Sequence, residues 1–175
     1  MNSIGLVGAS GFIGKHILLH RNESTNIIHL QHRGSIREIH SSLRSFNNLI
    51  KGSQASIIYL AENNDISEAE AKGKCYIEDN TSRLKVFLDN THAKIIYASS
   101  VDIYGDKSDE AHFPEENLIP SSTYAKSKFE CEKLVLAAGG TIARISNVYG
   151  QGMSSTNIIS EILAQISDPS IESIK

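Results

Sequence analysis

The chain has 175 residues, 40% of them hydrophobic and 21% charged, which is ordinary for a globular protein and excludes an intrinsically disordered chain. The formal net charge is −3, from 17 Lys and Arg against 20 Asp and Glu. This balance gives no overall positive field for nucleic acid or anionic lipid, although it leaves room for a local basic pocket that binds a phosphate.

The two cysteines and the N-terminus indicate the compartment. Cys75 and Cys131 are far apart and lack the spacing of metal ligands, so we expect reduced thiols rather than a disulfide or a zinc site. No basic region precedes the first apolar stretch, which favours a strand over a signal peptide. No apolar run approaches the roughly 20 residues that span a bilayer. These features predict a soluble cytoplasmic protein without a metal, a nucleic-acid partner or a membrane partner.

Short apolar runs alternate with longer helical patterns along the chain. Strands are predicted at 4–7, 26–31, 56–61, 94–99 and 141–148. Helices are predicted at 14–20, 41–51, 80–90 and 123–138, the third with a start as early as Cys75. The alternation predicts an α/β fold of the Rossmann type, a doubly wound, mostly parallel sheet with helices on both faces.

Three glycines follow the first predicted strand in the pattern G-x-x-G-x-x-G. Gly8 permits a tight turn, Gly11 lets the backbone approach a pyrophosphate, and Gly14 allows close packing of the following helix. The N-terminus of that helix offers free N–H groups to phosphates. The loop therefore predicts a dinucleotide site, which also includes Ser10, Phe12 and Ile13. An ordinary turn is the alternative.

The end of the second predicted strand bears on the choice between NAD and NADP. A carboxylate there would bind the ribose hydroxyls of NAD, whereas an arginine would accept the 2′-phosphate of NADP. Residues 29–34 contain no acid and include Arg33. This favours NADP, with a solvated loop arginine as the alternative.

A tyrosine and a lysine four residues apart lie on the predicted helix 123–138. Tyr124 and Lys128 share one helix face, and the ammonium group is expected to lower the pKa of the tyrosine toward the range of a general acid or base. Ser100 follows a strand whose carboxyl end faces the ligand crevice of a parallel sheet, so it is a candidate for orienting a substrate oxygen. An exposed tyrosine with a solvated lysine, and a serine that caps a strand end, are the alternatives.

The order of these motifs resembles that of the short-chain dehydrogenase/reductase superfamily. Further segments are similar to its extended branch, the NAD-dependent epimerase/dehydratase family, over about residues 3 to 152. They are Ile57-Ile-Tyr-Leu-Ala61, Asn80, Ser99-Ser100-Val-Asp-Ile-Tyr104-Gly105, Pro114-Glu115-Glu116 with Pro120, and Ala143-Arg144-Ile-Ser-Asn147-Val-Tyr149-Gly150-Gln-Gly152.

The resemblance implies residue roles and partners. Ser100, Tyr124 and Lys128 would form the catalytic trio, and Lys128 would also hold the nicotinamide ribose. Leu60 and Ala61 would line the cofactor site, and Asn147 would lie on the substrate side together with Ser100. The implied substrate is a nucleotide sugar, and the implied assembly is a homodimer packed through the helices near residues 80–90 and 123–138.

Some positions depart from the family pattern. Glu62 stands where a small residue is usual, and no acid lies in 39–43, where family members often contact adenine. Asp102 follows Ser100 by two residues, where dehydratases of the family carry an acid, but its neighbour Val101 is neither acid nor amide. Dehydratase chemistry is therefore possible but has no further support, and a solvated aspartate is favoured.

Family members continue for more than a hundred residues into a substrate-binding domain. We expect residues 1–152 to form the NAD(P)-binding domain and 153–175 to begin the substrate-binding region, with Asn157 to Ile166 as its first helix. Two interpretations stay open: a nucleotide-sugar epimerase, dehydratase or reductase, and a catalytically silent module that binds or senses NADP(H). The sequence does not name the sugar.

Overall fold

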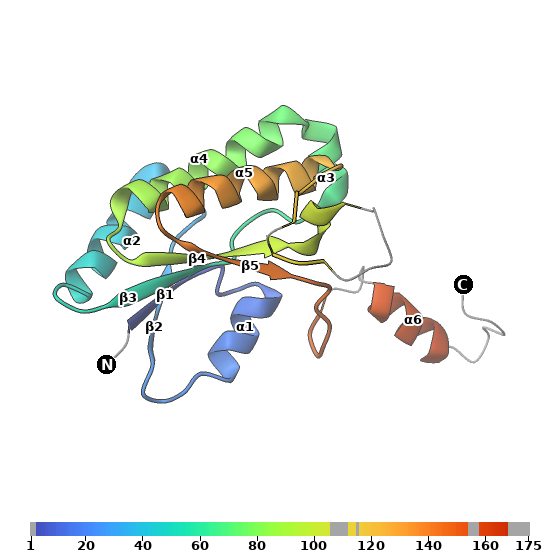
Figure 1. Ribbon diagram of the computed structural model, residues 1–175. Helices are drawn as coiled ribbons and strands as arrows, with labels where there is room; N and C mark the ends of the chain where they lie inside the picture. The colour runs from blue at the N-terminus through green and yellow to red at the C-terminus, as the bar shows by residue number, and fades with distance from the viewer. Residues whose placement is uncertain (1–2, 106–111, 115, 154–157, 168–175) are drawn as a thin grey trace.

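The computed structural model describes residues 3–105, 112–114, 116–153 and 158–167 (Figure 1). Five parallel strands form one sheet in the order β2-β1-β3-β4-β5. The strands are β1 (Ser3–Val7), β2 (Asn26–Leu30), β3 (Ala55–Tyr59), β4 (Lys94–Ser100) and β5 (Thr141–Ile145). The helices are α1 (Phe12–Leu19), α2 (Ile36–Leu49), α3 (Ile66–Lys72), α4 (Lys74–Asn90), η1 (Val101–Tyr104), α5 (Thr123–Ala137) and α6 (Ile158–Ser167). The predicted parallel sheet is confirmed.

The strand order reverses direction between β1 and β3. The chain leaves β1 through α1 to reach β2 on one side, and α2 then carries it back past β1 to β3. The two connections run in opposite directions across the sheet, and both crossovers are right-handed. Helices α1 and α2 therefore lie on opposite faces of the sheet. The loops after β1 and β3 therefore separate and leave a crevice at the carboxyl ends of the strands, where doubly wound proteins bind their ligands.

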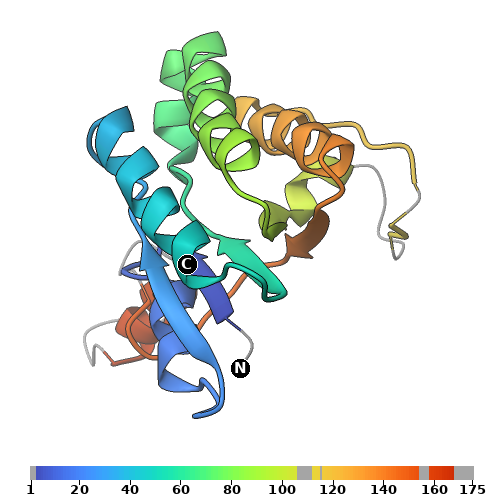
Figure 2. The same ribbon diagram turned by 90° about the vertical axis from the view of Figure 1, so that its left-hand side faces the viewer.

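Figure 2 shows α1 in blue below the sheet, and α2, α4 and α5 in cyan, green and orange above it. The larger core lies on the upper side. Its buried side chains come from strands β1 to β4 and from the three covering helices, and include Val7, Leu30, Ile39, Leu43, Phe46, Ile57, Tyr59, Leu84, Phe87, Ile95, Tyr97, Cys131 and Val135. This packing fixes the strand ends that carry the candidate site.

Three elements, α2, α3 and β5, differ most from the predictions. α2 begins at Ile36 because Ser35 and Glu38 form a capping box at its start, five residues before the predicted helix. The short helix α3 was not predicted. β5 ends at Ile145 rather than at residue 148, because its partner β4 ends at Ser100, opposite Ile145.

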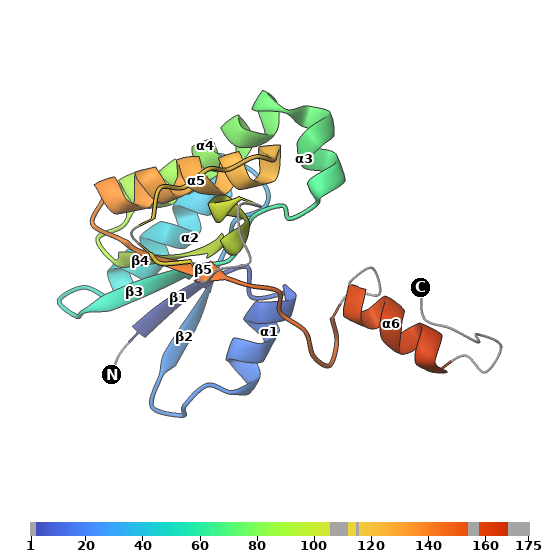
Figure 3. The same cartoon turned by 45° about the vertical axis from the view of Figure 1, so that its right-hand side comes forward.

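The last described helix lies beyond the carboxyl ends of the strands, to the side of the sheet (Figure 3). α6 occupies the expected position, although Asn157, the predicted start of that helix, lies outside the described residues, as does Glu115. In the part of the chain that the structure describes, no helix is long and apolar enough to cross a membrane.

Candidate cofactor and active site

The glycine loop between β1 and α1 has the geometry that its three glycines suggest. Gly8 has a φ of +91°, a conformation that side chains with a Cβ rarely adopt, and its carbonyl accepts a hydrogen bond from the Gly11 N–H at 3.0 Å. A Cβ on Gly14 would lie 2.3 Å from the Gly8 carbonyl oxygen. Gly11 caps α1 without a side-chain hydrogen bond, and the first turn contains no acid. The loop thus presents open backbone at a positive helix end.

A cleft of about 670 Å³ opens at the carboxyl ends of β3, β4 and β5. It brings together predicted residues from distant parts of the chain, namely Phe12, Ile13, Leu60, Ser100, Tyr124, Lys128 and Asn147. Ser99 also lines this cleft, and its hydroxyl is the one buried side-chain polar atom without a hydrogen-bond partner among the described residues. Gly8, Ser10, Gly11 and Gly14 are not among the lining residues and form the turn that leads into it.

Ser100 and Tyr124 interact at this cleft. Burial raises the pKa of Tyr124, and Lys128 and the hydrogen bond of Ser100 only partly offset this effect. The carboxylates of Glu62 and Asp102 raise it further. The expectation that Lys128 brings the tyrosine pKa down was therefore wrong for the net value, because burial outweighs the ammonium charge. Tyr124 is a protonated donor at neutral pH.

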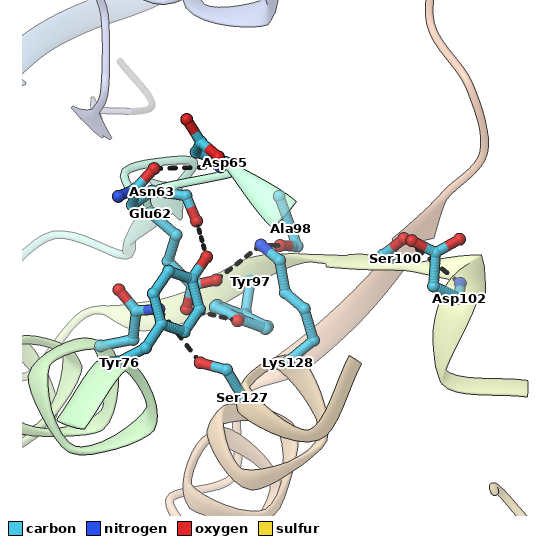
Figure 4. Close-up of polar contacts among 11 residues, drawn as sticks. Glu62, Asn63, Asp65, Tyr76, Tyr97, Ala98, Ser100, Asp102, Ser127 and Lys128 are labelled. Carbon is cyan, nitrogen blue, oxygen red and sulfur yellow. Dashed lines mark hydrogen bonds and ion pairs between the residues drawn. The ribbon is translucent and has the colours of Figure 1, made fainter. Parts of the chain in front are cut away.

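Lys128 lies in a buried polar cluster at the base of the cleft, drawn in Figure 4. Its ammonium group contacts Glu62 Oε2 at 2.6 Å and donates to the carbonyl oxygen of Ala98 at 3.0 Å. The other carboxylate oxygen of Glu62 accepts a hydrogen bond from the Tyr97 hydroxyl at 2.5 Å. The side chains of Glu62 and Lys128 are only 3% and 6% exposed. The sequence marked Glu62 as a departure but gave no sign of this pairing.

A second cleft, of about 590 Å³, adjoins the first, and Asn64 lines both. Predicted residues Arg33 and Ala61 line it together with His32 and Arg83 from α4. Burial lowers the pKa of His32, and the positive charges of Arg33 and Arg83 lower it further. The two arginines therefore create a local positive field in a chain of net negative charge. Arg83 was not predicted, because α4 reaches this position only through the fold.

Strand β5 is tied to helix α5 by an ion pair. Arg144 binds Glu132 of α5 through two nitrogens, at 2.9 and 3.1 Å, and also donates to the Tyr104 hydroxyl at 2.8 Å. Burial leaves the Glu132 side chain 2% exposed. These contacts tie β5 to α5 and so fix the direction in which the chain carries Asn147 to the cleft. Asn147 itself is exposed at the rim.

The stretch 39–43, where family members often carry an acid toward adenine, lies inside α2. Ile39 and Leu43 are buried in the core, and the chain passes from β2 directly into this helix. No sheet strand separates β2 from α2 in the described structure, so residues 39–43 belong to a helix and not to a strand end.

Fold and site together define a nucleotide-binding domain of the Rossmann type with a Ser-Tyr-Lys arrangement at its crevice. The model of the NAD-dependent epimerase/dehydratase family matches residues 4–174. The chain belongs to this family.

Solved structures share the fold at low sequence identity. RMD from Pseudomonas aeruginosa, complexed with NADPH, has a TM-score of 0.77 and 24% identity over 95% of this chain and 61% of its own. The dTDP-4-dehydrorhamnose reductase from Yersinia enterocolitica has a TM-score of 0.80 and 18% identity over 97% of this chain and 61% of its own. MoeE5, in complex with UDP-glucose and NAD, has a TM-score of 0.73 and 20% identity over 92% of this chain and 60% of its own. No curated protein matches the sequence. The chain thus spans about three fifths of the length of these structures.

The described residues fit a nicotinamide dinucleotide. The open backbone before α1 is suited to a pyrophosphate, and the unpaired Ser99 hydroxyl lines the cleft beside it. The basic cleft at Arg33 and Arg83 lies on the other side of Asn64. Both clefts are lined by residues that directly follow β3, one of the two strands between which the strand order reverses.

Proposed function

We propose that this chain binds NADP and takes part in the reduction of a carbonyl group on a nucleotide-activated sugar. The observation that carries the proposal is the cleft that joins the start of α1 to Ser100, Tyr124 and Lys128. Relatives of the same fold include dTDP-4-dehydrorhamnose reductases, one of them in complex with NADP. Because the chain covers only part of these relatives, the substrate and the reaction are proposals.

The cofactor would be held by three groups of residues. Gly8, Ser10 and Gly11 with the first turn of α1 would bind the pyrophosphate through backbone N–H groups. Phe12, Ile13, Leu60 and Ala61 would line the space between the two clefts, and Lys128 would bind the nicotinamide ribose. When bound, the cofactor supplies or accepts the hydride of the reaction.

Tyr124 would supply the proton. Its raised pKa keeps the hydroxyl protonated at neutral pH, which suits donation to a carbonyl oxygen as that oxygen gains an electron pair. Ser100 would orient the same oxygen, and Asn147 would bind the sugar from the rim. Proton donation to the carbonyl oxygen is the step that a reductase requires of this residue.

Arg33 and Arg83 would select NADP over NAD. Replacing either with Ala is expected to weaken NADPH binding by about tenfold or more, because a charge-assisted hydrogen bond to the 2′-phosphate is lost. NADH binding should change by less than about twofold. Fluorescence titration of both nucleotides measures this.

Arg37→Ala is the matched control, because Arg37 is an exposed arginine of α2 that does not line the cleft. A second measurement is the pKa of His32, which should rise when NADPH binds, since the phosphate offsets the two arginine charges, but should not rise with NADH. Equal losses for NADPH and NADH in Arg33→Ala and Arg83→Ala would contradict the assignment.

The implied homodimer through α4 and α5 stays a prediction, as does the cytoplasmic location. α4 and α5 pack against one another on the upper side of the sheet (Figure 1), as a shared helical interface requires. The division into residues 1–152 and 153–175 also stays a proposal, supported by the position of α6 beyond the strand ends.

A further inference from the structure

The carboxylate of Glu62 uses both of its oxygens inside the protein. One lies 2.6 Å from the Lys128 ammonium group, and the other accepts the Tyr97 hydroxyl at 2.5 Å. Tyr97 is fully buried in β4, and Glu62 follows β3, so the carboxylate joins two neighbouring strands to α5. Figure 4 shows the Lys128 side chain extending from α5 with its nitrogen directed at Glu62 and Ala98, away from Ser100.

We propose that Glu62 is the positioning residue of Lys128: its carboxylate fixes the ammonium group at the base of the cleft and keeps it charged. An ammonium group has three hydrogens, and Glu62 and Ala98 take two of them. The third remains for the cleft, where the nitrogen lies 5.7 Å from the centre of the Tyr124 ring. Because Lys128 acts in the proposed reaction, this role of Glu62 rests on the proposed function.

The charge of Lys128 depends on this partner. Burial by itself lowers the pKa of Lys128, but the Glu62 carboxylate, followed by Tyr124 and Cys131, acts in the opposite direction, so that the pKa is raised. A neutral amine would carry no charge to stabilise a phenolate at Tyr124, and it would have one N–H donor fewer to share among Glu62, Ala98 and a ribose. Removing the carboxylate while leaving the lysine buried should therefore produce the neutral form.

Other titratable groups do not replace Glu62. Those that face the pair are Tyr59 on β3, Tyr76 on α4, Tyr97 on β4, and Tyr124 and Cys131 on α5. Burial raises the pKa of each of these tyrosines and of the thiol, so they are uncharged at neutral pH. Asp102 is exposed and acts on Tyr124 rather than on Lys128.

The test follows the titration of Lys128 by the ¹³Cε resonance of the ¹³C-lysine-labelled 175-residue chain, without cofactor or substrate. Lys128→Arg assigns the resonance. In Glu62→Gln the midpoint should move to lower pH than in the wild-type chain, whereas Glu62→Asp should stay close to the wild type. Glu132→Gln removes a carboxylate equally buried, but paired with Arg144, and should leave the resonance unchanged.

The proposal is overturned if the midpoint of the Lys128 titration does not move in Glu62→Gln. It is also overturned if the midpoint moves as far in Glu132→Gln as in Glu62→Gln. If Glu62→Gln does not fold, the wild-type chain still decides. A Lys128 ammonium group bonded to Glu62 and Ala98 should give a ¹H–¹⁵N cross-peak protected from exchange with water at neutral pH, and the absence of that peak overturns the proposal.

The pH dependence of kcat is a second measurement, and a purely structural role of Glu62 would leave it unchanged. The charged form of Lys128 is present below its pKa, so in Glu62→Gln the alkaline limb of the kcat profile should move to lower pH. At pH 8, kcat should fall on the order of tenfold, with Glu62→Asp restoring most of it. If NADPH does not bind at all, the proposed function fails, whereas the lysine titration still reports on Glu62.

Discussion

Replacing Tyr124 with Phe is expected to lower the turnover of NADPH with a nucleotide-activated keto sugar by about 10²–10⁴-fold. The change removes the hydroxyl that carries the proton and keeps the ring that fills the cleft. Tyr124 lines the cleft together with Ser100, and the Lys128 nitrogen lies 5.7 Å from the centre of its ring. Turnover is followed by the loss of nicotinamide absorbance.

Cofactor binding separates a catalytic role from a structural one. Tyr124→Phe should leave the Kd for NADPH within about twofold of the wild-type value, because the dinucleotide would be held by the glycine loop and the two arginines. Tyr149→Phe is the matched control, since Tyr149 is an exposed tyrosine outside the lining of the cleft. Unchanged turnover in Tyr124→Phe would remove the assigned mechanism.

Gly14→Ala is expected to abolish detectable NADPH binding and to lower the free energy of unfolding by about 1–2 kcal/mol. Two effects oppose one another here. Alanine favours a helix over glycine by up to about 1 kcal/mol. Its Cβ, however, would lie 2.3 Å from the Gly8 carbonyl oxygen and 2.8 Å from Ala9 Cα, and backbone atoms cannot give way as a flexible side chain can. The steric overlap therefore outweighs the gain in helix propensity, and the substitution lowers the free energy of unfolding.

A second glycine of the loop provides the comparison. A Cβ on Gly11 would come no closer than 3.3 Å to the Gly8 carbonyl oxygen, so Gly11→Ala should lower the free energy of unfolding less than Gly14→Ala does. It should still weaken NADPH binding, since Gly11 lies where the backbone would meet the pyrophosphate. Denaturant unfolding and nucleotide titration of both variants check these results. Gly14→Ala with wild-type stability and binding would contradict the role given to the glycine loop.

The strands were predictable because each is a short apolar run between polar segments. All five occur where the sequence placed them to within one or two residues at each end, apart from the end of β5, which depends on where its partner β4 ends. The helix starts that were missed had local signals. Ser35 with Glu38, and Asp65 with Glu68, are each a capping residue followed three positions later by an acid that marks a helix start.

Only the site residues that belong to sequence motifs could be predicted. Tyr124 and Lys128 share a helix face, as i and i+4 spacing requires, and Ser100 follows a strand at the same edge. The net pKa of Tyr124 was not predictable, because it depends on burial by segments distant in sequence. The pairing of Glu62 with Lys128 joins residues 66 positions apart, and Arg83 reaches the basic cleft only when α4 packs over the sheet.

Titration of the 175-residue chain with NADPH and with NADH tests the central claim most directly. Nicotinamide fluorescence follows binding, and calorimetry checks the stoichiometry. We expect saturable binding of NADPH at one site per chain, tighter than binding of NADH because Arg33 and Arg83 meet the 2′-phosphate. Failure of both nucleotides to bind would contradict a functional cofactor site in this chain, and with it the proposed reaction.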